Sequence, residues 1–297
     1  MGSVSEAIAR RTTLGSLAER YGCELVPPFA GDVTITSLAD DVRSVTPGAL
    51  FVPSGEPDAA SLARARQAGA YAAAVPASAR EQGEAAELPL LVGDFGDGRL
   101  GMMASDVAGS PASSLAVFTM AGDAQSVEPN ARRLARLLHM LGNPVALIGS
   151  FGSTSLERDM ELDYPLGPLD VQRVLSLCQE DGVAAAIIAL DDATLAPQAL
   201  AGITVDVLGT DGMDSDPRKT TSAGAASERY GFAMDDQTHL VGRTGESDQI
   251  AMQFPAPGEQ SMAEVKRSSL AVAMVMAAGV RKNNIRNALR VSHDLGR

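Results

Sequence analysis

Short apolar runs alternate with longer amphipathic stretches along most of the chain. Runs of three to seven apolar residues predict buried strands, and stretches with apolar residues at helical spacing predict helices. The expected strands are residues 24–27, 49–52, 72–75, 89–92, 115–118, 145–148, 184–190 and 205–208. The expected helices are residues 1–20, 58–68, 77–86, 98–108, 128–141, 168–179, 262–278 and 283–290. This alternation predicts an α/β fold with mainly parallel sheets.

A Gly-Ser-Pro sequence at residues 109–111 interrupts the alternation and is typical of a linker. We therefore expect two domains, a small α/β domain over residues 1–112 and a larger one over residues 113–297. Three polar regions of the second domain have less regular patterns. Residues 149–164 are expected to form a loop, residues 210–228 a mobile loop, and residues 230–254 a β-hairpin or meander.

Residues 115–142 have the order of a nucleotide-binding motif, a buried strand, a loop and then a helix that opens at Glu128-Pro129. Such a loop binds phosphate when glycines expose its backbone N–H groups and a lysine supplies charge. Here the loop holds Met120, Asp123 and Ala124 instead. The architecture is present, but the residues that bind phosphate are not.

The composition argues against several classes of function and location. A net charge of −13 argues against binding to nucleic acid or to anionic membranes. Two cysteines cannot form a disulfide framework, and no signal peptide is recognisable. The longest apolar run, residues 270–280, is too short to span a bilayer. We therefore expect a cytoplasmic protein.

Residues 36–55 contain a motif that resembles the N-terminal domain of the Mur ligases, closest to the type that makes UDP-N-acetylmuramoyl tripeptide. The matching residues are Asp41, Val42, Arg43, Val45, Pro47, Gly48, Leu50, Phe51, Val52 and Gly55. Gln67-Ala68-Gly69-Ala70 is similar to the step into the next strand of that family. Leu295-Gly296-Arg297 resembles the boundary before the third domain, so the likeness is to a Mur ligase without its C-terminal domain.

The resemblance implies an ATP-dependent amide ligase that forms an acyl phosphate, with ATP in the middle domain. Against this, Ala124 stands at the position of the phosphate-binding lysine and Gln125 at that of the magnesium-binding hydroxyl. The metal-binding Glu and a nearby His fall at residues 189–193, where Asp191 and Asp192 are the only acids. Asp191 and Asp192 could bind a cation, but two adjacent acids at the end of a strand are more often solvated or cap the N-terminus of a helix.

The resemblance places a uridine-binding loop in the first domain, with Arg43, Ser44, Ser54 and Glu56 as the candidate substrate-binding residues. We predict no catalytic residue, no metal site and no cofactor site. His139 lies among leucines and is expected to be packed, and Arg132, Arg133 and Arg136 are expected to form a solvated helix face.

These observations favour a catalytically inactive relative, a binding or scaffold protein linked to the cytoplasmic synthesis of peptidoglycan precursors. Its expected partners are a UDP-muramyl precursor, an authentic Mur ligase or a second copy of the chain. The alternative is an ATP-dependent UDP-N-acetylmuramoyl-peptide amide ligase with an atypical nucleotide site, which would need ATP and magnesium. A third reading is a small-molecule binder that uses the cleft between domains for another ligand.

Overall fold

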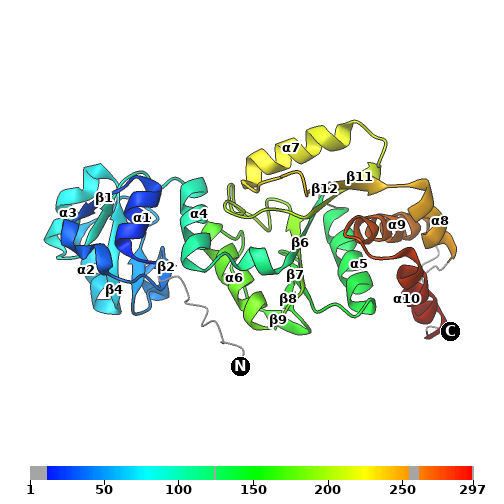
Figure 1. Cartoon of the computed structure of the whole chain (residues 1–297), viewed down its shortest axis with the longest axis horizontal. Coiled ribbons are helices and arrows are strands. Elements are labelled where there is room, and N and C mark those ends of the chain that lie inside the picture. The colour runs from blue at the N-terminus through cyan, green and yellow to red at the C-terminus, as the bar shows by residue number, and fades with distance from the viewer. Residues whose placement is uncertain (1–11, 124, 254–260, 296–297) are drawn as a thin grey trace, which may run out of the picture. The chain divides into compact units, whose positions relative to one another are not determined.

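The structure is a computed structural model that describes residues 12–123, 125–253 and 261–295. The chain divides into two compact units, Met1–Gly109 and Ser110–Arg297. Both units are mixed α/β with a mostly parallel sheet, as the sequence predicts (Figure 1). Each unit is described by itself. No described helix is long and apolar enough to cross a membrane.

The first unit contains a five-stranded sheet in the order β1-β5-β4-β3-β2. Strands β2 to β5 are parallel, and β1 pairs antiparallel with β5. The bounds are α1 Leu14–Tyr21, β1 Glu24–Val26, η1 Pro28–Asp32, β2 Ser37–Ala39, η2 Val42–Ser44, β3 Ala49–Phe51, α2 Ala59–Ala68, β4 Ala70–Val75, η3 Ala77–Ala79, α3 Arg80–Ala85, β5 Leu90–Val92 and α4 Asp97–Val107. Residues 1–11 of the helix expected at the N-terminus lie outside the described residues. The helix itself begins after Thr13, whose side chain caps it.

The second unit contains a seven-stranded sheet in the order β12-β11-β6-β10-β7-β8-β9. The five strands from β12 to β7 are parallel, and β8 and β9 extend the sheet as an antiparallel hairpin. The bounds are η4 Pro111–Ser114, β6 Ala116–Ala121, α5 Val127–Met140, β7 Val145–Ile148, β8 Ser153–Ser155, β9 Arg158–Met160, α6 Pro168–Glu180, β10 Ala185–Leu190, β11 Val207–Met213, α7 Arg218–Tyr230, β12 His239–Arg243, α8 Gly245–Gln253, α9 Met262–Ala277 and α10 Lys282–Leu295.

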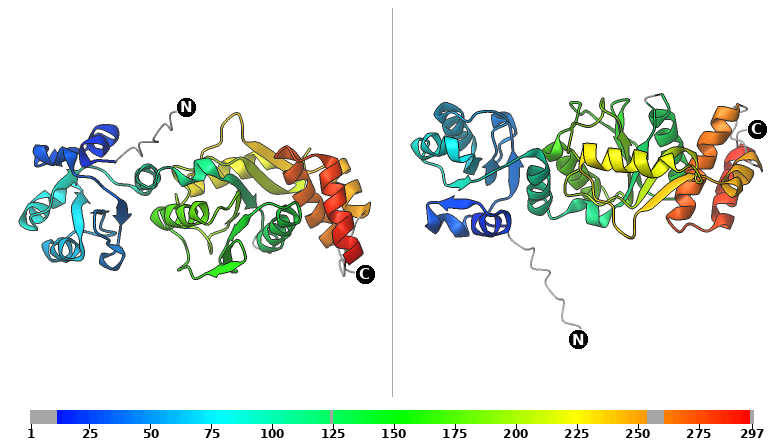
Figure 2. Two further views of the ribbon diagram at one scale, coloured as in Figure 1. Left: turned by 60° about the horizontal axis from the view of Figure 1, so that its bottom comes forward. Right: turned by 90° about the horizontal axis from the view of Figure 1, so that it is seen from above.

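Helices cover both faces of this sheet (Figure 2). The side chains of α6 and α7 join one hydrophobic cluster, and those of α5, α9 and α10 join the cluster on the opposite face. Strand β10 lies between β6 and β7, and all six of its residues are buried. A strand covered on both faces must be apolar throughout, which explains its Ala-Ala-Ile-Ile-Ala-Leu sequence.

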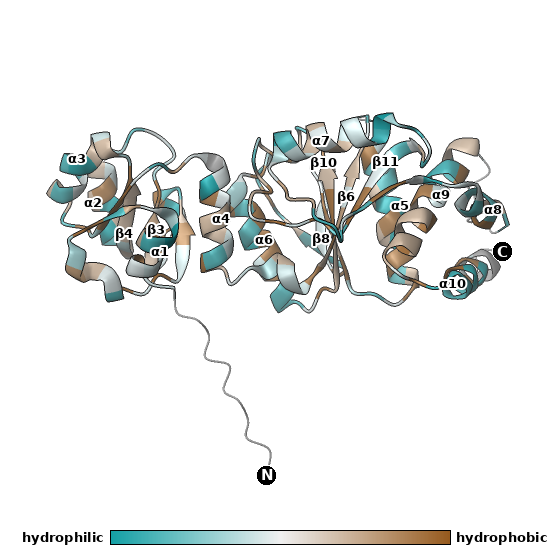
Figure 3. Cartoon of the chain, turned by 45° about the horizontal axis from the view of Figure 1, so that its top comes forward, coloured by the Kyte–Doolittle hydropathy of each residue, from teal (hydrophilic) through white to brown (hydrophobic). Residues whose placement is uncertain are grey.

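Three expectations for the second unit are wrong. Residues 149–164 include the hairpin β8–β9, and residues 210–228 form the end of β11 and most of α7 rather than a mobile loop. Residues 230–253 form a parallel strand and a helix rather than a hairpin, and Phe254 lies outside the described residues. Helix α7 lacks a leucine stripe because it buries only Ala223 and Tyr230, and its ribbon is mostly white or teal in the hydropathy colouring of Figure 3.

Candidate functional site

The carboxyl ends of β6, β10 and β11 meet at one edge of the second sheet. In open α/β sheets, ligands bind at this edge, where successive loops diverge. A pocket of about 410 Å³ lies here. Its lining residues come from the three strand ends and from α7: Ala121, Gly122, Asp123, Leu190, Thr210, Asp211, Asp216, Arg218, Lys219, Ser222 and Ala226. This is the place where the strand–loop–helix pattern of the sequence leads us to look for a phosphate.

Several backbone N–H groups of the segment between β6 and α5 donate hydrogen bonds to Asp123 in the same segment. The carbonyl of Asp123 accepts hydrogen bonds from the N–H groups of Ser126 at 2.9 Å and Val127 at 3.2 Å. The Asp123 carboxylate accepts another from the N–H of Gln125 at 3.0 Å. A phosphate loop works by leaving such N–H groups for the anion. Ala124, at the expected lysine position, lies outside the described residues.

A second carboxylate, that of Asp211 on β11, reaches the first turn of α5. It accepts a hydrogen bond from Asn130 Nδ2 at 2.9 Å and one from the Ser126 hydroxyl. Asn130 is only 4% exposed, so its amide depends on this partner. A Cβ added to Gly122 would lie 2.7 Å from Asp211 Oδ2, which shows how closely the loop and the carboxylate approach. Asp211 thus supplies the negative charge that a helix N-terminus favours.

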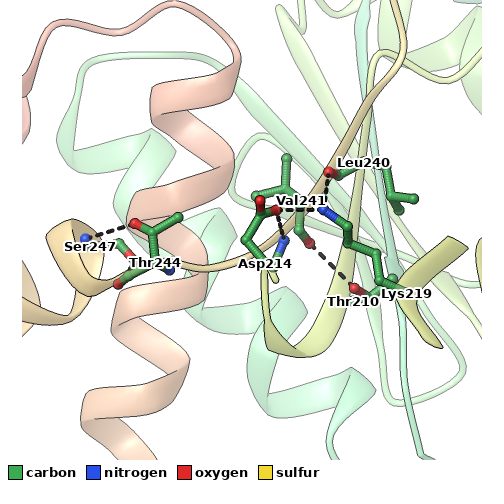
Figure 4. A network of polar contacts seen from close by, with 8 residues as sticks. Thr210, Asp214, Lys219, Leu240, Val241, Thr244 and Ser247 are labelled. Carbon is green, nitrogen blue, oxygen red and sulfur yellow. Dashed lines mark hydrogen bonds and ion pairs between the residues drawn. The ribbon is translucent and has the colours of Figure 1, made fainter. Parts of the chain in front are cut away.

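The lysine of this pocket is engaged elsewhere (Figure 4). Lys219 Nζ lies 2.7 Å from Asp214 Oδ1 and donates to the carbonyl of Leu240 at 3.3 Å. The N–H of Gly242 donates to the same Asp214 oxygen at 3.1 Å. The bond from Lys219, with that from Gly242, holds the pKa of Asp214 below its usual value. The ammonium therefore joins α7 to the ends of β11 and β12 rather than facing an open anion site.

The remaining cation of the pocket is also paired. Arg218 Nε donates to Asp216 Oδ1 and Arg218 Nη2 to Asp216 Oδ2, and hydrogen bonds from Arg218 lower the pKa of Asp216 to about 2. With Asp123 and Asp211 added, three carboxylates line the pocket against two cations, and both cations are paired. A polyphosphate entering here would meet negative charge at short range.

The two acids that follow β10 have structural partners. Asp191 Oδ1 accepts a hydrogen bond from the N–H of Thr194 at 2.8 Å, as a cap does. Asp192 forms an ion pair with Arg229 at 2.6 Å and accepts a hydrogen bond from the Tyr230 hydroxyl at 2.8 Å. The bond from Arg229 is the main cause of the lowered pKa of Asp192. Among the described residues, no group of three or more His, Cys, Asp or Glu side chains could hold a metal ion.

The four candidate residues of the first unit lie on two neighbouring loops. Arg43 and Ser44 are in η2, which Asp41 caps, and Ser54 and Glu56 follow β3. The Ser54 hydroxyl donates to the carbonyl of Asp40 at 2.9 Å and so ties the loops together. Arg43, Ser54 and Glu56 are exposed and Ser44 is half-buried. Their role in binding a UDP-sugar stays a prediction.

Two expectations for α5 need correction. His139 is exposed rather than packed, because it is one residue beyond Leu138 and thus turned about 100° away from the leucine stripe. Arg133 is 5% exposed and belongs to the buried side, whereas Arg132 and Arg136 are exposed as expected. The guanidinium of Arg132 lies over the ring of Phe151, 4.8 Å from its centroid.

Sequence reasoning missed Asp211 and Asn130, the residues that complete the loop. Asp211 lies 85 residues from Ser126 and fell within a region expected to be a mobile loop. No local spacing connects the two. Only the adjacency of β6 and β11 in the sheet brings them together.

Comparison with known proteins supports the fold. No protein-family model matches the sequence, and no curated protein does. A solved UDP-N-acetylmuramoyl-L-alanyl-D-glutamate–2,6-diaminopimelate ligase superimposes with a TM-score of 0.60 at 13% identity, over 96% of this chain and 66% of that one. MurF from Acinetobacter baumannii superimposes with a TM-score of 0.54 at 15% identity, over 95% of this chain and 68% of the MurF chain. The chain has the Mur ligase fold.

The shared fold extends through both units of the described chain. A second structure of MurF from Acinetobacter baumannii gives a TM-score of 0.52 at 14% identity. The 297 residues span about two thirds of the length of these solved Mur ligases. At this level of identity the comparison establishes architecture, and function must be argued from the site.

Proposed function

We propose that this chain is a catalytically inactive, Mur-ligase-like binding or scaffold protein linked to the cytoplasmic synthesis of peptidoglycan precursors. One observation carries the proposal. The loop where this fold would take the phosphates of ATP has its backbone donors bound by Asp123 and its helix N-terminus faced by the Asp211 carboxylate.

The residues present do not fit ATP and magnesium. The loop from residue 122 to residue 126 holds one glycine and no lysine, and Gln125 replaces the metal-binding hydroxyl expected from the resemblance. Lys219 and Arg218 are tied to Asp214 and Asp216. A triphosphate that displaced the Asp211 carboxylate would leave the buried amide of Asn130 without this hydrogen-bond partner.

The ligand side of the proposal rests on the first unit. The solved ligases that share this fold are named for UDP-N-acetylmuramoyl substrates. Here Arg43 offers an exposed guanidinium suited to a diphosphate, with Ser44 beside it in η2, and Ser54 and Glu56 offer polar groups on the adjoining loop. We propose that these four residues bind a UDP-muramyl precursor and that the second unit, freed from catalysis, contacts an authentic ligase or another copy of the chain.

Two assays on the purified full chain test the proposal. The first measures ATP-dependent amide formation from UDP-N-acetylmuramoyl peptides and amino acids, and we expect none. Measurable turnover would establish the alternative, an ATP-dependent amide ligase with an atypical nucleotide site.

The second assay measures calorimetric binding of a UDP-N-acetylmuramoyl peptide. We expect Arg43→Glu to weaken binding at least about tenfold, because it removes a charged partner of the diphosphate and adds repulsion. Arg64→Glu, an exposed reversal on α2, is the matched control and should bind like the unaltered chain. Equal affinities for the two variants would rule out the assigned binding loop.

A further inference from the structure

Three carboxylates follow one another at the last strand of the second sheet. Asp159 lies in β9, Glu161 and Asp163 follow it at every second residue, and all three are exposed. The residues between them, Met160 and Leu162, are half-buried and pack against the hydrophobic cluster that α6 and α7 share. Successive side chains of a strand point to opposite faces, so the three acids lie on the other face of the sheet. We call these three residues the acidic row.

The sheet has no helical cover where the acidic row lies. Asp159 stands beside Thr154 of β8, and Thr154 stands beside Leu147 of β7, which belongs to the cluster of α5, α9 and α10. Among the described helices, none makes extensive contact with β8 or β9. The acidic row therefore lies where one more helix would continue the layer formed by α5 and α9.

The acidic row has no cation beside it. Arg158, the nearest arginine in sequence, pairs with Asp181 instead. In the part of the chain that the structure describes, Asp159, Glu161 and Asp163 take part in no ion pair. Side chains two residues apart on a strand are about 7 Å apart, close enough for like charges to repel. A cationic partner would relieve this repulsion.

Helix α10 has the opposite charge. Asn283, Arg286, Asn287 and Arg290 are spaced so that they share one face of the helix, and all four are exposed. We call these four residues the basic face. No acidic residue occurs between residues 278 and 292, although the whole chain has a net charge of −13. Within the described ranges, neither Arg286 nor Arg290 forms an ion pair.

The basic face and the acidic row match in spacing as well as in charge. Arg286 and Arg290 are about 6 Å apart along the helix axis, and Asp159 and Glu161 are about 7 Å apart along the strand. Each guanidinium can donate two hydrogen bonds to one carboxylate. The two asparagine amides beside the arginines both donate and accept, so they suit the free N–H and C=O groups of β9, which is an edge strand.

The two surfaces of one chain do not meet each other. Helix α10 packs against α5, and α5 packs over β7 and β10. Helix α5 therefore lies between α10 and the hairpin β8–β9 (Figure 1). A basic face that covers the acidic row must come from another copy of the chain, and two copies related by a two-fold axis would make this contact twice.

We propose that the basic face of α10 in one copy docks on the acidic row of a second copy, and that two such contacts hold a dimer. The proposal selects the second copy from the partners named in the proposed function, and it rests on that function only for the binding role of the second unit. It requires neither ATP nor a UDP-sugar. Its failure would remove this partner and leave the assays of amide formation and UDP-sugar binding unaffected.

Sedimentation velocity of the full chain, without any ligand, measures this association. At low salt we expect a species with twice the mass of the chain. High salt should weaken the dimer at least about tenfold, because salt screens exposed charges. Two double variants reverse one surface each, Arg286→Glu with Arg290→Glu and Asp159→Lys with Glu161→Lys. All four positions are exposed, so both variants should keep the fold, and each should be monomeric.

Mixing the two double variants tests the contact directly. The reversed face of one variant complements the reversed row of the other, so the mixture should form a dimer that neither variant forms alone. The control Arg64→Glu with Lys266→Glu changes the net charge equally at exposed positions and should dimerise like the unaltered chain. The inference is overturned if the unaltered chain is monomeric at low salt, if either double variant dimerises normally, if the mixture stays monomeric, or if the control is monomeric too.

Discussion

The contact between Asp211 and Asn130 gives the sharpest prediction for stability. Asp211→Ala removes the carboxylate that accepts a hydrogen bond from the Asn130 amide, which is buried at the start of α5. An unpaired buried donor costs about 1–3 kcal/mol, and losing a carboxylate from a helix N-terminus costs a further 0.3–1 kcal/mol, roughly. We expect a loss of about 2 kcal/mol in the free energy of unfolding of the second unit. That corresponds to a fall in Tm of about 4–8 °C.

Two further variants identify the cause. Asp211→Asn keeps an oxygen that can accept from Asn130 and should cost less than about 1 kcal/mol. In Asn130→Ala the donor itself is gone, so the added change Asp211→Ala should cost little more. The coupling energy from this double-mutant cycle should be about 1–2 kcal/mol.

Denaturant unfolding of the full chain, with hydrogen exchange of α5 as a probe specific to the second unit, supplies the four free energies. Hydrogen exchange is needed because two units need not unfold in one step. If the single changes add to within about 0.5 kcal/mol, Asp211 and Asn130 do not interact. The account of the loop as held by Asp211 would then fail.

Three other predictions concern the core, a close backbone approach and pH. Leu134→Ala, at a fully buried position of α5, should destabilise the second unit by about 2–5 kcal/mol in denaturant unfolding, and a smaller loss would show that the site collapses around the cavity. Gly242→Ala should cost more than about 1 kcal/mol, because its Cβ would lie 2.8 Å from the backbone N of Asp214, and an unchanged Tm would contradict this contact. The hydrogen bond from Arg229 lowers the pKa of Asp192 from 3.8, so the pairing stabilises the fold above about pH 4 and this stabilisation is lost as the pH falls. Asp192→Asn should therefore reduce the loss of stability at acid pH in a plot of unfolding free energy against pH. A curve parallel to that of the unaltered chain would refute the pairing.

Elements with a strong apolar signal could be predicted from the sequence. The continuous apolar run of β10 gave its position, and the leucines of α5 gave its buried side. The alternation of strands and helices gave two mostly parallel sheets. In each case burial against a helix layer imposes the pattern that the sequence displays.

The parts that were missed have weak local signals. Helix α7 buries only Ala223 and Tyr230, and the strands β8 and β9 contain Ser, Thr, Arg and Asp with a single apolar residue, Met160. The loop after β6 could be recognised as lacking a lysine. The contact between Asp211 and Asn130 could not be predicted, because it exists only through the position of β11 beside β6 in the sheet.

The most direct test of the proposed function is thermal unfolding of the full chain with ATP–magnesium and, separately, with a UDP-N-acetylmuramoyl peptide. A ligand at 100 times its Kd stabilises a protein by about 2.7 kcal/mol, a shift of several degrees, roughly, for units of this size. We predict no shift with millimolar ATP–magnesium and a clear shift with the UDP-sugar peptide. A shift with ATP–magnesium would contradict the account, because it would mean that a triphosphate binds despite Asp123 and Asp211.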